Sequence, residues 1–424
     1  MQSGRPRVII LQANKFFFEK GGSERYMFAL CDALTGRGHE LLHFSMAHPN
    51  NRPSQQSGYF VPQRDYDGPL RPASVPALLN FVWSREAARR LDALLSERLP
   101  DVAHMHNIYH QLTPSIIAAL SRRGVPVVMT LHDYKLVCPS YGMFAHGEPC
   151  YRCRGGRYHH AVTVGCGGSR ARSAMLATEA YWQKRTRVYD LVDCFIAPSA
   201  YMRDVMVDSG IAPERVIHIP QLSPEAGVPE ALSEDEQRLL ADLPARFVMY
   251  AGRVSAEKGV DVLVEAMSRI RDVPLVIFGE GPMAAPLRLA CEKSPARNVY
   301  FAGHARRTIL EHAFARTEAL VVPSLWAENA PMVVLEAARA GAPVIATDRG
   351  GLPELAGRAG GCIVPAGDAA ALADAIRSVW ENTDEWKARA RTAWNAHRAA
   401  HEAANHVRAI EAIYQRAITR RRAA

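Results

Sequence analysis

Short apolar runs alternate with segments of helical periodicity along most of this 424-residue chain, and this alternation constrains its fold more than any other feature. Each run ends in turn residues and leads through a polar loop into a helix-like stretch. Parallel strands need such crossover helices, so the pattern predicts an α/β fold with parallel sheets. The runs are Arg7–Gln12, Asp101–His106, Pro126–Leu131 and Cys194–Pro198, then Phe247–Gly252, Leu275–Gly279, Val299–Gly303, Ala319–Pro323, Pro343–Thr347 and Cys362–Val364.

The alternation pauses in the middle of the chain, over a stretch rich in Pro, Glu and Ser. We interpret residues 221–244 as a linker between two doubly wound domains, residues 1–220 and 245–380, with a cleft between them. Residues 381–424 have a helical composition, and we expect C-terminal helices there that pack back on the N-terminal domain. In sheets of this kind ligands bind beyond the carboxyl ends of the strands.

The composition is typical of a globular protein, with 48% hydrophobic and 22% charged residues, and it excludes wholesale disorder and a disulfide-stabilised miniprotein. No stretch reaches the ~18 unbroken apolar residues of a membrane-spanning helix. The first apolar run is interrupted by Gln12, Asn14 and Lys15, which favours a buried strand over a signal peptide. We therefore expect a cytoplasmic protein whose eight cysteines are reduced.

The chain is basic, since 51 Lys and Arg residues exceed 43 Asp and Glu residues, for a net charge of +8. Nucleotide diphosphates, phospholipid surfaces and nucleic acids all fit this charge. The basic residues are scattered apart from an arginine-rich tail, and no nucleic-acid-binding motif occurs, so we expect no nucleic-acid partner. The amphipathic segment Ala77–Leu99 carries Arg85, Arg89 and Arg90 on polar positions. It fits a helix with one solvated face, or one that touches an anionic membrane surface.

Glycine-rich turns follow two of the predicted strands. Gly21 and Gly22 precede a helix expected over Tyr26–Leu34, with Ser23 as its N-cap, and could bring backbone N–H groups to an anion. A plain structural turn explains them equally well, because the G-x-G-x-x-G spacing is absent. Gly279 and Pro282 form a similar turn in the second half.

Two cations follow the first strand of the second half. Arg253 and Lys258 lie within Gly252–Gly259. A planar guanidinium beside a compact ammonium group suits a diphosphate, although isolated surface cations are more often simply solvated.

Two carboxylates flank a predicted helix start in the segment that begins at Pro323. Pro331 suits the first helical position and Gly341 the stop, so we expect a helix over residues 331–340. Glu328 then lies in the loop before the helix and Glu336 more than one turn inside it. They cannot form the facing acid and nucleophile of a glycosidase, so we expect each carboxylate to accept hydrogen bonds from a separate set of hydroxyls.

Taken together, these segments resemble the retaining glycosyltransferases of family 4, which have the GT-B fold of two Rossmann-like domains facing each other across a cleft. The resemblance covers nearly the whole chain, and its most specific element is the E-x7-E pair Glu328 and Glu336. It implies that Arg253 and Lys258 neutralise the diphosphate of a nucleotide-sugar donor and that Glu336 binds the ribose. Glu328 would bind the donor sugar and His132 would lie at the reacting centre. The other implied donor-binding residues are Gly21, Gly22, Gly279, Pro282, Gly303, His304, Asn329, Ala330, Pro331 and Met332.

The implied reaction moves a sugar from a nucleotide-diphosphate sugar, based on UDP or GDP, to an acceptor hydroxyl with retention at the anomeric carbon. The resemblance implies no catalytic metal, because cations and helix N-termini would serve instead. It also implies a saccharide or lipid-linked acceptor, a role in polysaccharide or glycolipid assembly, and a cytoplasmic location, with peripheral binding at the inner membrane face as an open alternative.

Four of the eight cysteines lie close together in a C-x11-C-x2-C-x12-C pattern over residues 138–166. One close pair fits tetrahedral zinc, and this glycine-rich insert could hardly build a core unaided. Structural zinc and reduced structural thiols remain equal alternatives. The candidate ligands are Cys138, Cys150, Cys153 and Cys166.

Two other functions fit part of the sequence. A nucleotide-sugar epimerase would bind the same donor but would need no separate acceptor site, and the E-x7-E pattern argues against it. A non-enzymatic basic protein that binds nucleic acid or lipid is the second alternative.

Overall fold

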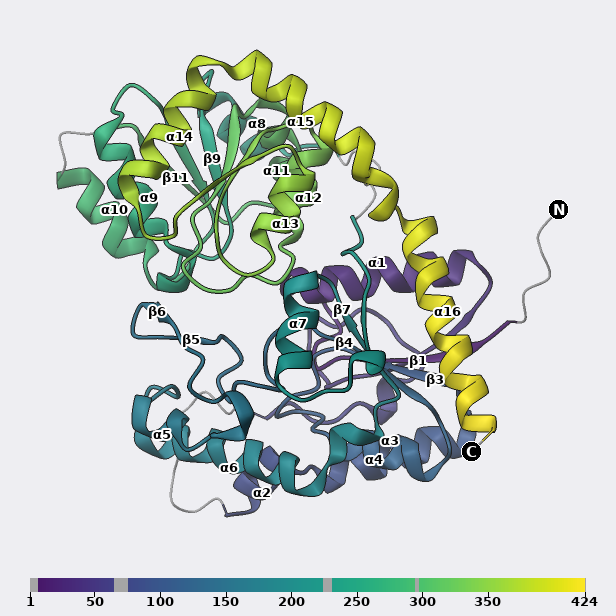
Figure 1. The fold of residues 1–424 in the computed structure, drawn as a ribbon. Coiled ribbons are helices and arrows are strands. Elements are labelled where there is room, and N and C mark those ends of the chain that lie inside the picture. The colour runs from purple at the N-terminus through teal and green to yellow at the C-terminus, as the bar shows by residue number, and fades with distance from the viewer. Residues whose placement is uncertain (1–6, 65–74, 224–230, 294–296, 424) are drawn as a thin grey trace. The chain divides into compact units, whose positions relative to one another are not determined.

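The computed structural model describes residues 7–64, 75–223, 231–293 and 297–423 of the chain. These form two compact units, each an α/β layer structure around its own parallel sheet (Figure 1). Unit 1 comprises Met1–Met143, Cys150–Leu222 and Ala403–Ala424. Unit 2 comprises Phe144–Pro149 and Ser223–Glu402.

The sheet of unit 1 has six parallel strands in the order β2-β1-β3-β4-β7-β8. The strands are β1 Ile9–Ala13, β2 Glu40–Phe44, β3 Val102–Met105, β4 Val127–Thr130, β7 Cys194–Ala197 and β8 Val216–His218. The helices are α1 Gly22–Gly36, α2 Val75–Val82, α3 Arg85–Glu97, α4 Ser115–Arg122, α5 His160–Val164, α6 Arg170–Thr186, α7 Ala200–Asp208 and α16 Ala403–Arg422. The last helix, α16, packs beside α1 (Figure 1).

The sheet of unit 2 also has six parallel strands, in the order β11-β10-β9-β12-β13-β14. The strands are β9 Val248–Ala251, β10 Leu275–Phe278, β11 Val299–Gly303, β12 Ala319–Val322, β13 Val344–Thr347 and β14 Cys362–Val364. The helices are α8 Glu234–Asp242, α9 Val260–Arg269, α10 Ala284–Lys293, α11 Arg307–Arg316, α12 Met332–Arg339, α13 Leu352–Arg358, α14 Ala369–Glu381 and α15 Thr383–His397.

Both faces of the unit 2 sheet are covered, which explains why its strands are continuous apolar runs. Along β9 the side chains alternate between the two cores: Val248 and Tyr250 pack in one cluster, and Met249 packs in the other. The strands therefore read as uninterrupted hydrophobic segments, and this is the pattern from which the sequence predicted them.

Two predicted helix starts differ from the structure. Helix α1 begins at Gly22, its N-cap is Gly21, and no side chain caps it, so Ser23 lies inside the helix and the predicted cap is wrong. The expected single helix over Ala77–Leu99 is two helices, α2 and α3, because Ser84 caps α3 by accepting a hydrogen bond from the Ala87 N–H.

The segment 221–244 contains helix α8, which begins with a capping box in which Ser233 and Glu236 satisfy each other's backbone. Glu236 also forms a two-pronged ion pair with Arg306 at the start of α11, at 2.5 and 2.8 Å. After α15 the chain passes through a short 3-10 turn, Arg398–Ala400, into α16. Among the described residues, no helix combines the length and the apolar character needed to cross a membrane.

Candidate functional site

The turns at the carboxyl ends of β9 and β10 pack so tightly that two positions admit only glycine. A Cβ atom on Gly279 would lie 1.8 Å from the carbonyl oxygen of Gly252, and one on Gly281 would lie 2.2 Å from that of Val254. Gly279 also has a φ of +142°, which side-chain-bearing residues rarely adopt. The two turns are joined by hydrogen bonds from Gly252 N to Phe278 O and from Val254 N to the Glu280 carbonyl, at 2.9 and 3.0 Å. They therefore present bare backbone at the carboxyl edge of the sheet, where ligands bind in doubly wound folds.

A third turn joins this group from β11. The Gly279 N–H donates to the carbonyl of Gly303 at 2.7 Å, and His304 follows as an exposed side chain. The predicted residues Gly279, Gly303 and His304 thus meet at the same edge.

Lys258 and Glu328 form the central ion pair of unit 2. Lys258 Nζ lies 2.7 Å from Glu328 Oε1, and the same oxygen accepts a hydrogen bond from Ser324 Oγ at 2.6 Å. The Glu328 side chain is 6% exposed. Burial alone would raise the pKa of Glu328, but the charge of Lys258 and these two hydrogen bonds outweigh it and hold the pKa below its usual value. Glu328 is therefore an ionised hydrogen-bond acceptor.

The backbone of Glu328 is held by a glycine pair that the sequence analysis missed. Gly351 N donates to the Glu328 carbonyl at 2.7 Å, and a Cβ on Gly350 would lie 2.1 Å from that carbonyl oxygen. Gly350 and Gly351 follow β13 and precede α13, so the rule of strand, glycine turn and helix would have identified them.

Helix α12 begins directly after this loop. Its N-cap is Pro331 and its first residue is Met332, one position later than predicted. The sequence stretch Asn329–Met332 therefore brings the N-terminus of α12, with its unpaired N–H groups, to the edge where Glu328 lies. Glu336 lies inside the helix and is 7% exposed. The two carboxylates are not neighbours on one helix face.

Arg253 differs from Lys258 in having no ion pair among the described residues, and its side chain is exposed. It follows Gly252 directly, so it lies at the same edge. Lys258 is thus paired with a carboxylate, whereas Arg253 faces solvent and is available to bind an anion.

Gly21 and Gly22 lie at the N-terminus of α1 in unit 1 and are exposed. The first turn of α1 also carries Glu24, which is buried and accepts a hydrogen bond from Asn14 Nδ2 at 3.1 Å. A carboxylate thus already lies beside the turn at which the sequence predicted an anion.

His132 follows β4, and its Nε2 lies 3.0 Å from Nδ1 of His106, which follows β3. His106 Nε2 in turn lies 2.9 Å from Gln12 Oε1 on β1. Burial lowers the pKa of His132 to about 3, so the ring is neutral at physiological pH. The sequence analysis missed His106, because nothing local links it to a residue 26 positions away.

A buried ion pair fixes the segment after His132. Lys135 Nζ lies 2.7 Å from Glu179 Oε2 on α6, and both side chains are at most 1% exposed. His110 Nε2 contacts the same oxygen at 3.2 Å. The loop that leads into the cysteine-rich insert is therefore anchored to α6 by charge.

The four cysteines of the insert carry free thiols. Burial raises the pKa of the Cys153 thiol to about 12, and the neighbouring Cys138, Cys166 and Cys150 add to the rise. The thiols are thus close enough to influence one another. Yet within the described ranges no three His, Cys, Asp or Glu side chains are grouped so that they could hold a metal ion. The zinc prediction is therefore not confirmed, and both alternatives, structural zinc and reduced structural thiols, stay predictions.

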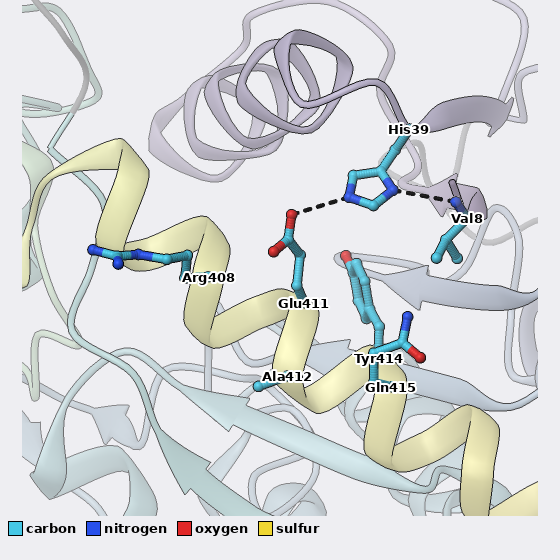
Figure 2. Close-up of a pocket in the computed structure, with 7 residues that line it drawn as sticks. All are labelled: Val8, His39, Arg408, Glu411, Ala412, Tyr414 and Gln415. Carbon is cyan, nitrogen blue, oxygen red and sulfur yellow. Dashed lines mark hydrogen bonds and ion pairs between the residues drawn. The ribbon is translucent and has the colours of Figure 1, made fainter. Parts of the chain in front are cut away.

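One cavity in unit 1 lies away from the carboxyl ends of the strands. It opens between α16 and the residues that precede β1 and β2, and Figure 2 shows His39 between Val8 and Glu411. Glu411 also accepts from Arg37 at 2.5 and 3.0 Å. The carboxylate in this cavity is thus already paired with His39 and Arg37, and the cavity lies at the amino ends of the strands, so we do not assign it to the functional site.

Two family descriptions match the chain in succession. "Glycosyltransferase Family 4" matches residues 20–221 and "Glycosyl transferases group 1" matches residues 233–399. The chain is 30% identical to O-antigen chain mannosyltransferase C of Escherichia coli over 32% of its own length and 38% of that protein. It is 28% identical to D-rhamnosyltransferase WbpZ of Pseudomonas aeruginosa over 38% of its length and 42% of that protein. The matched regions thus span about two fifths of these relatives.

Solved structures confirm the architecture over nearly the whole chain. Sucrose-phosphate synthase of Thermosynechococcus elongatus aligns with a TM-score of 0.67 at 19% identity, covering 97% of this chain and 99% of that one. Anabaena HepE in complex with UDP-glucose aligns with a TM-score of 0.66 at 16% identity, covering 96% and 100%. The two Rossmann-like units have the GT-B fold, and with both family descriptions matched in order the chain belongs to glycosyltransferase family 4.

Proposed function

We propose that the protein transfers a sugar from a nucleotide-diphosphate sugar to an acceptor hydroxyl, with retention at the anomeric carbon. The observation that carries this proposal is the edge of unit 2 where Arg253, Lys258 and Glu328 meet bare glycine turns. The arrangement offers cations for a diphosphate, a carboxylate for sugar hydroxyls and backbone for close approach. Membership of family 4 supports the same reading.

Each part of the donor has a matching group in unit 2. Arg253 supplies a guanidinium with no competing carboxylate, and Lys258 supplies an ammonium group, so together they neutralise the diphosphate. Glu328 is ionised and accepts hydrogen bonds from the donor sugar. Glu336, one turn further along α12, accepts from the ribose, and the backbone of Asn329–Met332 lies alongside the sugar.

The chemistry then needs charge stabilisation more than a protein nucleophile. The bond between the anomeric carbon and the phosphate oxygen breaks, and the acceptor oxygen attacks from the same face. The acceptor proton passes to the leaving phosphate, whose negative charge the cations stabilise. A catalytic metal is not part of this proposal, because side chains and a helix N-terminus supply the positive field.

His132 contributes in its neutral form. Because burial lowers its pKa to about 3, it does not bring a positive charge to the leaving group at physiological pH. It can instead orient a hydroxyl by hydrogen bonding. We place it at the acceptor or sugar hydroxyl for this reason.

We further propose a saccharide or lipid-linked acceptor in polysaccharide or glycolipid assembly, with peripheral binding to an anionic membrane. Two relatives are named as an O-antigen chain mannosyltransferase and a D-rhamnosyltransferase, which supports the first part, the role in polysaccharide or glycolipid assembly. For the second, α6 exposes Tyr181 and Trp182 by 41% and 47% beside Lys184 and Arg185. Its one acidic residue, Glu179, is buried. Aromatic and basic side chains on one exposed helix suit a lipid interface.

Nucleotide binding tests the donor site. Thermal unfolding is measured with UDP, GDP, ADP and CMP for the wild type, Arg253→Ala and the control Arg271→Ala, which removes an exposed arginine at the opposite edge of the sheet. A ligand at about a hundred times its dissociation constant adds roughly 2.7 kcal/mol. One nucleotide should stabilise the wild type and the control but not Arg253→Ala. No shift with any nucleotide would contradict the proposal.

Product analysis separates the transferase from an epimerase. The protein is incubated with sugar derivatives of the stabilising nucleotide and without an acceptor. Under these conditions a transferase releases at most free sugar by hydrolysis. An epimerase yields a new sugar nucleotide, and that product would overturn the proposal.

A further inference from the structure

Buried polar side chains of unit 1 form a continuous chain of hydrogen bonds that begins at the carbonyl of Pro220. His406 Nδ1, on α16, lies 3.0 Å from that oxygen, and His406 Nε2 lies 2.8 Å from the hydroxyl of Tyr26. The Tyr26 hydroxyl is also hydrogen-bonded to the side chain of Thr130. The first three links thus join the end of unit 1's second segment to α1 and β4.

The chain continues across the sheet and back to α16. Thr130 Oγ1 lies 2.7 Å from His104 Nε2, and His104 Nδ1 lies 2.6 Å from the hydroxyl of Tyr414. That hydroxyl lies 3.5 Å from Gln12 Nε2. All four residues are at most 2% exposed, so the contacts are shielded from water.

The last two links reach the candidate site. Gln12 Oε1 lies 2.9 Å from His106 Nε2, and His106 Nδ1 lies 3.0 Å from His132 Nε2. The chain thus connects Pro220 to His132 without interruption.

A carbonyl oxygen can only accept, and this fixes the direction of every link. His406 Nδ1 must carry the hydrogen that it donates to the Pro220 carbonyl. The unprotonated Nε2 of the same ring therefore accepts a hydrogen bond from the Tyr26 hydroxyl. Because the Tyr26 hydrogen is then used, Thr130 must donate to the Tyr26 oxygen. The Thr130 oxygen is left to accept from His104 Nε2–H.

The same counting carries through to the site. His104 Nδ1 accepts from the Tyr414 hydroxyl, whose oxygen accepts from the Gln12 amide. The Gln12 carbonyl oxygen accepts from His106 Nε2–H. His106 Nδ1 is therefore unprotonated, and it must accept a hydrogen bond from His132 Nε2–H. Every contact receives one hydrogen.

The opposite orientation of the Gln12 amide fails this count. With its N–H group toward His106, the carbonyl oxygen of Gln12 would accept from Tyr414, and the links beyond it would reverse. Thr130 would then donate to His104 while Tyr26 still donates to His406. The contact between Thr130 and Tyr26 would hold no hydrogen, so this orientation is disfavoured.

We propose that the Pro220 carbonyl, acting through His406 and Tyr414 of α16, holds His132 in the tautomer with hydrogen on Nε2 and the lone pair on Nδ1. His406 and Tyr414 are then positioning residues, since neither is bonded to His132. The count takes all four rings as neutral. Burial lowers the pKa of His104 and His132 to about 3 and that of His106 well below its usual value, and the His406 ring, 2% exposed, lies in the same buried cluster.

The consequence for catalysis rests on the proposed function. With Nε2–H committed to His106, His132 can offer its Nδ1 lone pair to a substrate hydroxyl and can serve that hydroxyl only as an acceptor. The tautomer itself is independent of the proposed function, because it can be observed without any substrate.

The test is nitrogen NMR of the full chain labelled with ¹⁵N-histidine, recorded in the solid state at pH 7.5. Protonated and lone-pair ring nitrogens resonate in separate regions, and the His132 signals among the sixteen histidines are identified by their loss in His132→Gln. The wild type should show His132 as Nε2–H alone. A His132 ring that is Nδ1–H, mixed or doubly protonated in the wild type would overturn the proposal.

Two variants test the route. His406→Phe removes the anchor and Tyr414→Phe cuts the chain, so in each the reversed set of hydrogen bonds becomes available and His132 should populate both tautomers. Tyr189→Phe is the matched control, since it removes a buried hydroxyl that has no hydrogen-bond partner in the described structure, and it should leave His132 as Nε2–H. A single Nε2–H tautomer in both test variants would show that α16 does not set it.

Discussion

Lys258 Nζ lies 2.7 Å from Glu328 Oε1, so the cation and the carboxylate that both belong to the proposed donor site are bonded to each other. Their side chains are 22% and 6% exposed, and the pair is therefore largely shielded from solvent. A diphosphate that binds at Lys258 competes with Glu328 for the same ammonium group. Donor binding then exchanges one ion pair for another, so the weakened pair with Glu328 offsets part of the attraction between Lys258 and the phosphate.

This pairing predicts that Lys258→Met destabilises unit 2 by about 1–3 kcal/mol, because it leaves a buried carboxylate without its cation. The double variant Lys258→Met with Glu328→Gln should recover part of the loss. Urea unfolding of the four proteins gives the coupling energy. Arg377→Met is the control, since it breaks an exposed pair with Asp272 and should cost under about 1 kcal/mol. Equal losses of stability in Lys258→Met and Arg377→Met would show that the buried pair contributes no more than an exposed one.

The glycine turns predict a steep cost at Gly279. Gly279→Ala should destabilise unit 2 by more than about 3 kcal/mol, because its Cβ would meet the Gly252 carbonyl at 1.8 Å and its φ is positive. Gly357→Ala is the matched control: it lies inside α13 with open space around it, and should stabilise by about 0.5–1 kcal/mol. Thermal unfolding compares the two, and a neutral Gly279→Ala would contradict the packing described.

The buried histidines predict that unit 1 loses stability in acid. In the unfolded chain these rings take up a proton near pH 6.5, whereas in the folded protein the pKa of His104 and His132 is about 3. The unfolded state therefore binds more protons between these values, and stability falls as the pH drops from 6.5 toward 3. Each ring contributes a slope of about 1.4 kcal/mol per pH unit.

Denaturant unfolding from pH 7.5 to pH 5 measures this slope. His104→Asn should reduce it by about one ring's share, while replacement of the exposed His304 by Asn should leave it unchanged. A slope that does not respond to His104→Asn would contradict the assigned burial.

The burial of Cys153 predicts a protected thiol. With a pKa of about 12 and 8% exposure, Cys153 should resist alkylation at pH 7.5 and react fully after unfolding in denaturant. Mass spectrometry of peptides measures the labelling, with the less buried Cys150 as the internal comparison. Stoichiometric zinc, together with loss of fold in chelator, would confirm the zinc prediction.

The fold was predictable from sequence wherever strands are covered on both faces. The six runs of the second half match β9 to β14, because each is a continuous apolar segment. The prediction missed β2 and β8, the two edge strands of unit 1. Several of their residues are only half-buried, so their apolar signal is weak.

The site was predictable only in its local parts. The placement of Glu328 before a helix and Glu336 within it follows from Pro331 and helical spacing, and the structure confirms that placement. The roles assigned to these residues stay predictions. The hydrogen-bonded chain that ends at His132 could not be predicted. Strand order brings His106 and Gln12 together with His132, and a returning helix brings Tyr414 to Gln12, so neither leaves a trace in the neighbouring sequence.

Helix α16 belongs to unit 1, although its residues are synthesised after those of unit 2. During translation the strands of unit 1 are therefore complete long before the helix that supplies Tyr414 and His406. Until then Gln12, Tyr26 and His104 lack their hydrogen-bond partners on α16, while unit 2 emerges from the ribosome in between. Unit 1 can finish folding only after unit 2 has been synthesised, so premature termination at any point before α16 leaves buried polar groups in its interior without their hydrogen-bond partners.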